Sequence, residues 1–163
     1  MWRVRFSPDE QGGWTYRTVC SDQSNKGLHN QTGSFQCRKN RGDLSLLRHG
    51  ELRLSANKRY IEHTDGTPFF WLADTVWCGP LLADLDEWDV FLKDRVEKEF
   101  TAMQFVMTQW RMARTDAAGN PAFTGKEKVA VNPAFFQRMD KYIDAINDAG
   151  LLAVPVLLWA IRG

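Results

Sequence analysis

The chain has 163 residues, of which 44% are hydrophobic and 25% are charged, a composition typical of globular domains. Its formal net charge of +1 gives no electrostatic reason to expect nucleic acid or a membrane surface as a partner. The longest apolar run, residues 151–161, is shorter than the roughly 20 residues that cross a bilayer, so it predicts a buried segment. The opening residues lack the apolar core of a signal peptide, and the sequence leaves the compartment open.

The first part of the chain predicts short β-strands. Residues 2–6 alternate apolar and arginine side chains, residues 14–19 alternate less cleanly after the Gly12-Gly13 turn, and residues 34–38 form a third short stretch. The polar segment between the last two is rich in turn-forming residues. Because three short strands cannot bury a core alone, we expect them to belong to a larger β-domain that begins before Met1.

A hairpin precedes the first buried strand. Leu52 and Leu54 are followed by a turn at residues 56–58, and the Asp65-Gly66 dipeptide is a strong signal for a tight turn. Residues 68–74, "PFFWLAD", are then mostly apolar without alternation. Such a run predicts a strand that is covered on both faces, as in a parallel sheet.

Two helices alternate with two further strands in the rest of the chain. Asp84 is the expected N-cap of the first helix, and Asn132-Pro133 is the expected start of the second. Residues 102–110 and 151–159 are the predicted strands, and Pro155 predicts a bulge or irregular pairing within the last one.

The order of strand, helix, strand, helix, strand is typical of an α/β fold with a parallel sheet. Right-handed crossovers should place the three strands side by side in chain order. Such a sheet has open edges and one poorly covered face, so we interpret the chain as a fragment of a longer protein. We also expect self-association through the open sheet edge.

Three stretches resemble one protein family. "VRFSPDEQGGWTYRT", "GLHNQTGSFQC" and "LRLSANKRYIEHTDGTPFFWLADTVW" resemble the apiosidase-like bacterial glycoside hydrolases, which more often have Gly where Ala73 stands. The resemblance implies a (β/α)₈ barrel preceded by a β-sandwich domain. Residues 1–48 would be the C-terminal part of the sandwich, and residues 49–163 the entry hairpin and the first three βα units of the barrel. A whole barrel has about 250 residues, so more than half of it would lie outside this chain.

The expected barrel directs attention to the carboxyl ends of its strands, where barrel active sites lie. A carboxylate there can accept hydrogen bonds from sugar hydroxyls, and a tryptophan offers a flat face on which a sugar ring can stack. The predicted substrate-binding residues are Asp74, Trp77, Gln109, Trp110, Arg111 and Trp159. For Asp74 the alternative is a local backbone cap, and for the tryptophans it is core packing. Asp116, in the long loop 111–131, is expected to be exposed.

Glycoside hydrolysis normally needs two carboxyl groups. The resemblance implies that they lie on the fourth and seventh barrel strands, outside this chain. We therefore expect no catalytic residue here, and a chain that is inactive alone but supplies the substrate-binding rim of a hydrolase acting on polysaccharides or oligosaccharides. The alternatives are a non-catalytic carbohydrate-binding or scaffold protein, and a small α/β protein unrelated to sugars. The spacing of the histidine and cysteine residues gives no indication of a metal site, and we expect no cofactor.

Overall fold

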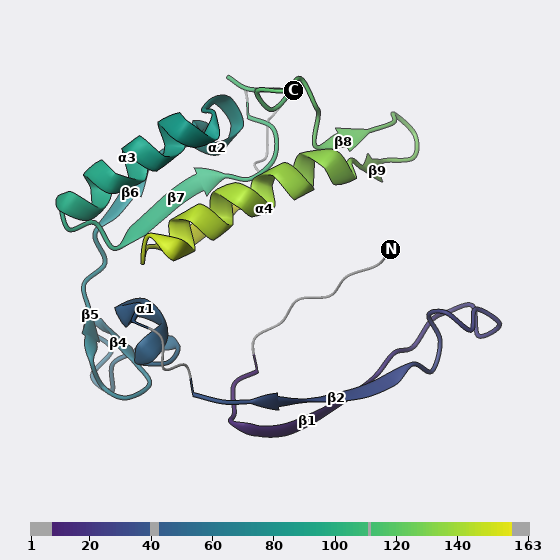
Figure 1. Cartoon of the computed structure of the whole chain (residues 1–163), viewed down its shortest axis with the longest axis horizontal. Coiled ribbons are helices and arrows are strands. Elements are labelled where there is room, and N and C mark those ends of the chain that lie inside the picture. The colour runs from purple at the N-terminus through teal and green to yellow at the C-terminus, as the bar shows by residue number, and fades with distance from the viewer. Residues whose placement is uncertain (1–7, 40–42, 111, 158–163) are drawn as a thin grey trace.

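The computed structural model describes residues 8–39, 43–110 and 112–157. These residues form a parallel α/β unit, a small antiparallel sheet and two hairpins (Figure 1). In chain order the elements are β1 (Gly12–Arg17), β2 (Thr32–Cys37), α1 (Ser45–Arg48), β3 (Leu52–Leu54), β4 (Ile61–His63), β5 (Pro68–Phe69), β6 (Ala73–Thr75), α2 (Gly79–Leu82), α3 (Leu85–Glu97), β7 (Ala102–Val106), β8 (Phe123–Thr124), β9 (Ala130–Val131), α4 (Pro133–Asp148) and β10 (Leu152–Val156).

The N-terminal hairpin consists of β1 and β2, which pair antiparallel. Trp14 lies opposite Phe35, and their rings are nearly parallel, with centroids 6.4 Å apart. Two of the three strands predicted for this part of the chain are therefore confirmed. The third, at residues 2–6, lies outside the described residues. That these strands belong to a larger β-domain stays a prediction.

The small antiparallel sheet has the order β3-β4-β5. The Asp65-Gly66 turn forms as predicted: Gly66 has a φ of +88° and its N–H donates to the His63 carbonyl at 2.9 Å. This turn pairs Pro68 and Phe69 with β4, so residues 68–74 are not one strand, which corrects the expectation. The next residues, Phe70 and Trp71, are 74% and 45% exposed, so the middle of the apolar run is not covered on both faces.

The parallel sheet has the order β10-β7-β6, so the predicted side-by-side arrangement in chain order is confirmed. The expected bulge at Pro155 is wrong, because Pro155 pairs with Phe105 in an uninterrupted register. Leu152 donates its N–H to Thr101 on the β7 side, and alternate N–H groups of a strand point to opposite sides. The missing N–H of Pro155 therefore faces away from β7, where proline is tolerated.

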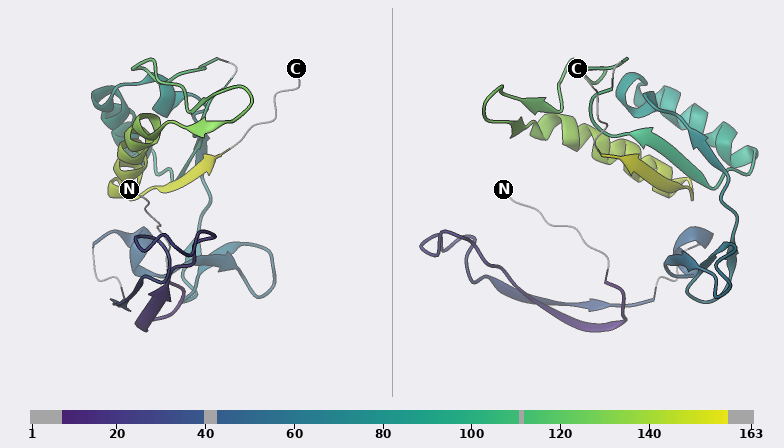
Figure 2. Two further views of the ribbon diagram at one scale, coloured as in Figure 1. Left: turned by 90° about the vertical axis from the view of Figure 1, so that its right-hand side faces the viewer. Right: turned by 180° about the vertical axis from the view of Figure 1, so that it is seen from behind.

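Both long helices begin with the predicted caps. The Asp84 carboxylate accepts the Glu87 N–H at 2.8 Å, and the Glu87 side chain accepts the Asp84 N–H at 3.1 Å, which completes a capping box. Asn132 accepts the Ala134 N–H at 3.2 Å, with Pro133 at the first helical position. The helices α3 and α4 lie on the same face of the parallel sheet (Figure 2, left).

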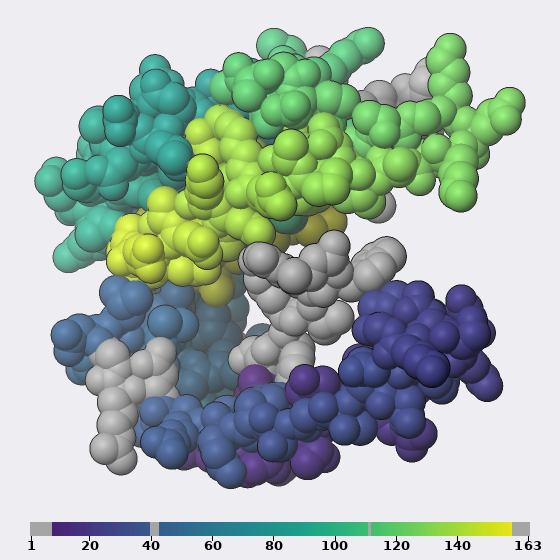
Figure 3. Space-filling view, turned by 45° about the vertical axis from the view of Figure 1, so that its right-hand side comes forward, coloured from purple at the N-terminus to yellow at the C-terminus, as the bar shows by residue number. Residues whose placement is uncertain are grey.

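The main core fills the space between this face of the sheet and the helices. Its largest fully buried side chains include Trp88, Leu92, Met103, Phe105, Phe135, Met139, Tyr142 and Ile146. The β8–β9 hairpin lies beyond the start of α4 and projects from this unit, in green at the upper right of Figure 3. None of the described helices has the length and apolar character that a membrane span requires.

Candidate functional site

The carboxyl ends of β6 and β7 lie at one edge of the parallel sheet. Beyond β6 the hydrogen bonding continues, because Val76 donates its N–H to Gln104 and Val106 donates its N–H to the Trp77 carbonyl, both at 2.9 Å. Trp77 is therefore level with the last residue of β7. The candidate site, called the rim, is this edge of the sheet. It consists of Trp77 and the residues that come directly after β7.

An aromatic pair from two different strand ends forms the centre of the rim. The rings of Trp77 and Trp110 stack with centroids 5.7 Å apart and an interplanar angle of 23°. Trp110 is 8% exposed, and its N–H and carbonyl both bond to Ala113, at 2.8 and 2.9 Å, in a tight turn after β7. The fold thus brings together two of the residues that the sequence predicted for the site. Trp110 also belongs to the main core cluster and Trp77 packs against it, so the core-packing alternative describes this pair as well.

The segment between β7 and this turn has alternating exposure. Gln109 is exposed, whereas Thr108 is 4% exposed and donates its hydroxyl to the Leu157 carbonyl at 3.0 Å. Gln109 can therefore reach a ligand in solvent, and Thr108 joins this segment to the chain that follows β10. Sequence reasoning missed Thr108, because its partner is distant in the chain and no local pattern indicates it.

Asp74 does not lie at the rim, and this positional prediction is wrong. Asp74 pairs with Met103 near the amino end of β7, and directly paired residues in a parallel sheet point to the same face. That face carries the helices, where the Asp74 carboxylate accepts a hydrogen bond from Arg95 at 2.7 Å. The alternative prediction, a local backbone cap, is not observed either, because the partner of the Asp74 carboxylate is this arginine on α3.

Arg95 is held by several groups at the end of α3. Its guanidinium lies 5.0 Å from the ring centroids of both Phe91 and Phe100. The carboxylate of Asp94, and after it that of Asp74, raises the pKa of Arg95 above its ordinary value. Asp74 therefore fastens the last turn of α3 to the sheet.

Asp116 is also engaged within the protein. It was expected to be exposed, but only 3% of it is, which corrects the expectation. Its carboxylate accepts the N–H groups of Ala118 at 3.0 Å and Asn120 at 2.8 Å. An aspartate that bonds the backbone just after it stabilises a turn, so this side chain organises the loop.

The short helix α2, which follows Trp77, is fastened by α4. Arg138 donates to the carbonyls of Pro80 at 2.6 Å and Ala83 at 2.7 Å, and the Tyr142 hydroxyl donates to Ala83 at 2.7 Å. Burial raises the pKa of Tyr142, and burial also raises the pKa of the Cys78 thiol beside Trp77. These contacts hold the backbone immediately beyond the aromatic pair.

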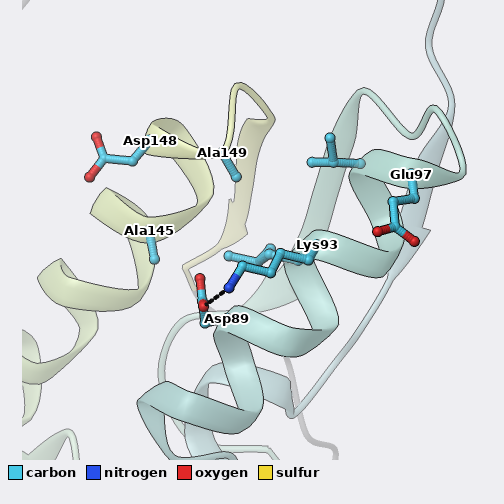
Figure 4. A pocket seen from close by; sticks show the side chains of 8 residues that line it. Asp89, Lys93, Glu97, Ala145, Asp148 and Ala149 are labelled. Atoms are coloured by element: carbon cyan, nitrogen blue, oxygen red, sulfur yellow. Dashed lines mark hydrogen bonds and ion pairs between the residues drawn. The ribbon is translucent and has the colours of Figure 1, made fainter.

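Two hollows lie among the helices and are separate from the rim. One, of about 550 Å³, lies between α3 and α4, where Ala145 and Ala149 face the Asp89–Lys93 ion pair of 2.6 Å (Figure 4). The other, of about 380 Å³, lies near the start of α3. Neither is lined by Trp77 or Trp110.

The remaining predicted site residues, Arg111 and Trp159, lie outside the described residues. Within the described ranges, no group of three or more histidine, cysteine or acidic side chains could hold a metal ion. Among the described residues, the predicted ones that lie at the rim are Trp77, Gln109 and Trp110.

Comparison with known proteins identifies relatives of this region. Residues 55–163 match the model of the family described as "Apiosidase-like, catalytic domain". No curated protein matches the chain.

Similar solved structures include a chain described as a glycoside hydrolase, with a TM-score of 0.58 and 25% identity, over 68% of this chain and 26% of that one. A family 5 glycoside hydrolase from Bacteroides vulgatus ATCC 8482 has a TM-score of 0.58 and 23% identity, over 68% and 25%. A candidate glycoside hydrolase from the same strain has a TM-score of 0.68 and 22% identity, over 93% and 31%. The chain thus spans between a quarter and a third of the length of these structures.

Proposed function

The chain belongs to the apiosidase-like family of catalytic domains, and from that premise we propose that it forms part of a glycoside hydrolase whose sugar substrate binds at the rim. Residues 49–163 would be the N-terminal part of a (β/α)₈ barrel, and residues 1–48 the end of a β-sandwich domain. The parallel order of β6, β7 and β10, with both helices on one face, supports the barrel assignment.

The observation that carries this proposal is the stacked pair of Trp77 and Trp110 at the carboxyl ends of adjacent parallel strands. In parallel α/β folds, ligands bind at this end of the strands. An indole edge or face packs against the apolar face of a sugar ring, and the exposed amide of Gln109 can both donate to and accept from hydroxyl groups. An aromatic surface beside an amide suits a neutral carbohydrate.

We propose that the catalytic carboxyl pair comes from residues other than Asp74 and Asp116. The Asp74 carboxylate is bound by Arg95, and the Asp116 carboxylate is bound by backbone N–H groups of its own loop. The two therefore have structural partners and no described contact with the rim. Asp74 accordingly leaves the proposed substrate-binding set, whereas Trp77, Gln109 and Trp110 stay in it, and so do Arg111 and Trp159 from outside the described residues.

Binding of oligosaccharides tests the proposal. The protein in its natural length would be titrated calorimetrically with soluble oligosaccharides prepared from plant and bacterial cell-wall polysaccharides. Gln109→Ala and Trp110→Phe should weaken binding of any oligosaccharide that the unaltered protein binds. Trp71→Ala is the matched control, because Trp71 is 45% exposed and precedes β6 at the opposite end of the sheet. Binding that is insensitive to both rim variants, or no binding to any of the oligosaccharides, would contradict the proposal.

A non-catalytic carbohydrate-binding protein is the second candidate. The observation that favours it is that both Asp74 and Asp116 are engaged in structural contacts. Release of reducing sugar by the natural-length protein distinguishes the two candidates. Binding with turnover supports the hydrolase, and binding without turnover supports the second candidate.

A further inference from the structure

Two threonine hydroxyls fasten the ends of β7 to neighbouring segments. Before β7, Thr101 donates its hydroxyl to the Phe70 carbonyl at 2.6 Å, on the side of β6. After β7, Thr108 donates its hydroxyl to the Leu157 carbonyl at 3.0 Å, on the side of β10. Both hydroxyls donate to a backbone carbonyl, and they lie at opposite ends of the strand. The Thr101 hydroxyl also accepts the Leu72 N–H at 2.9 Å.

The Thr108 contact extends the hydrogen bonding between β7 and β10. The preceding contact is a backbone one, in which Met107 donates its N–H to the Val156 carbonyl at 3.0 Å. One residue further along each of the two segments, the donor is the Thr108 side chain and the acceptor is the next carbonyl, that of Leu157. A buried hydroxyl thus continues the pairing at the point where the chain turns away from the sheet.

We propose that Thr108 is a positioning residue for the rim, an inference that rests on the proposed sugar-binding function of that surface. Only Gln109 separates Thr108 from Trp110, which is itself fixed by its two hydrogen bonds to Ala113. The hydroxyl anchor on one side and the tight turn on the other define where the Trp110 ring meets Trp77. Thr108 therefore acts on the ligand through Gln109 and Trp110, without touching it.

The geometry of the tryptophan pair gives a direct readout. Two stacked indoles couple their electronic transitions and produce a paired positive and negative band in the far-ultraviolet circular dichroism, whose amplitude depends on their separation and angle. The natural-length protein and its Trp77→Phe variant, which lacks the pair, give a difference spectrum that contains this band. No ligand is required.

Four threonine variants test the inference. Thr108→Val has nearly the same shape but no hydroxyl, and it should lose most of the band, whereas Thr108→Ser keeps the donor and should retain the band. Thr108→Ala is a second hydroxyl-free variant, for use if the valine side chain prevents folding. Thr101→Val is the matched control, because it removes the corresponding hydroxyl at the other end of β7 and should leave the band intact.

Opposite results would overturn the inference. A full band in a folded hydroxyl-free Thr108 variant would show that the anchor does not set the pair. An equal loss in Thr101→Val would show that any weakening of β7 has the same effect. Because this readout involves no sugar, a failure of oligosaccharide binding would refute the proposed function without changing the result of the circular dichroism test.

Discussion

Replacing Tyr142 with phenylalanine should weaken the attachment of α2 to α4. Tyr142 is 1% exposed, and its hydroxyl donates to the Ala83 carbonyl at 2.7 Å and accepts from Arg138 at 2.5 Å. Phenylalanine keeps the ring, which packs 6.0 Å from that of Trp88, and removes only the hydroxyl. The perturbation therefore isolates two hydrogen bonds.

The expected loss in the free energy of unfolding is about 2 kcal/mol. A neutral hydrogen bond contributes about 0.5–1.5 kcal/mol net, and one to a charged group about 1.5–3 kcal/mol. The lower end of both ranges applies, because Arg138 keeps the carbonyls of Pro80 and Ala83 as acceptors and the Ala83 carbonyl keeps Arg138 as a donor. For a chain of this size, such a loss lowers the melting temperature by about 4–8 °C.

Urea unfolding followed by circular dichroism measures this change. If the slope of the unfolding free energy against urea concentration is unaltered, only the stability has changed. Tyr60→Phe is the matched control, because Tyr60 is 48% exposed and lies outside the main core. Surface substitutions of this kind change stability by less than about 0.5 kcal/mol. A change as small as this in Tyr142→Phe would refute the assignment of the two hydrogen bonds.

The same substitution should also change how the stability of the protein depends on pH. Burial raises the pKa of Tyr142, so the folded protein keeps the phenol proton at a pH where the unfolded chain has lost it. The contribution is fully present below about pH 10, the ordinary tyrosine pKa, and is lost as the pH rises through the higher pKa of the folded state. The unaltered protein should therefore lose stability above about pH 10 more steeply than Tyr142→Phe. Parallel pH profiles of the two proteins would contradict this.

Three further predictions concern activity, association and the loop after β7. The 163-residue chain should release no reducing sugar from cell-wall polysaccharides, and any hydrolysis by this chain would contradict the prediction. Because β6 and β10 are edge strands among the described residues and Leu157 is 60% exposed, the chain should self-associate in light-scattering measurements; a single monomeric species at micromolar concentration would count against it. Asp116→Ala removes the acceptor for two loop N–H groups and should speed proteolysis of the loop, whereas Asp148→Ala should not; equal cleavage rates would refute the turn-stabilising role.

Several elements of the fold could be predicted from neighbouring residues alone. Asp84 and Asn132 each bond an N–H group two or three residues further along the chain, and the Asp65-Gly66 turn closes within its own hairpin. The order of strands and helices then restricts the parallel sheet to one arrangement, because crossovers between parallel strands are right-handed. These features depend on local backbone chemistry, which the sequence displays directly.

The tertiary structure decided which residues reach the rim. Within residues 68–74, the first residues pair with β4 and the last ones pair with β7, and no residue type indicates where this change occurs. The register of Asp74 relative to β7 could therefore not be predicted from the sequence. The contacts of Asp74 with Arg95, of Trp77 with Trp110 and of Thr108 with Leu157 all join residues far apart in the chain. The sequence by itself determined that aromatic and polar residues occur near the carboxyl ends of the predicted strands. Only the register between those strands, set by hydrogen bonds that no local pattern specifies, placed the tryptophans at the rim and turned Asp74 toward the helices.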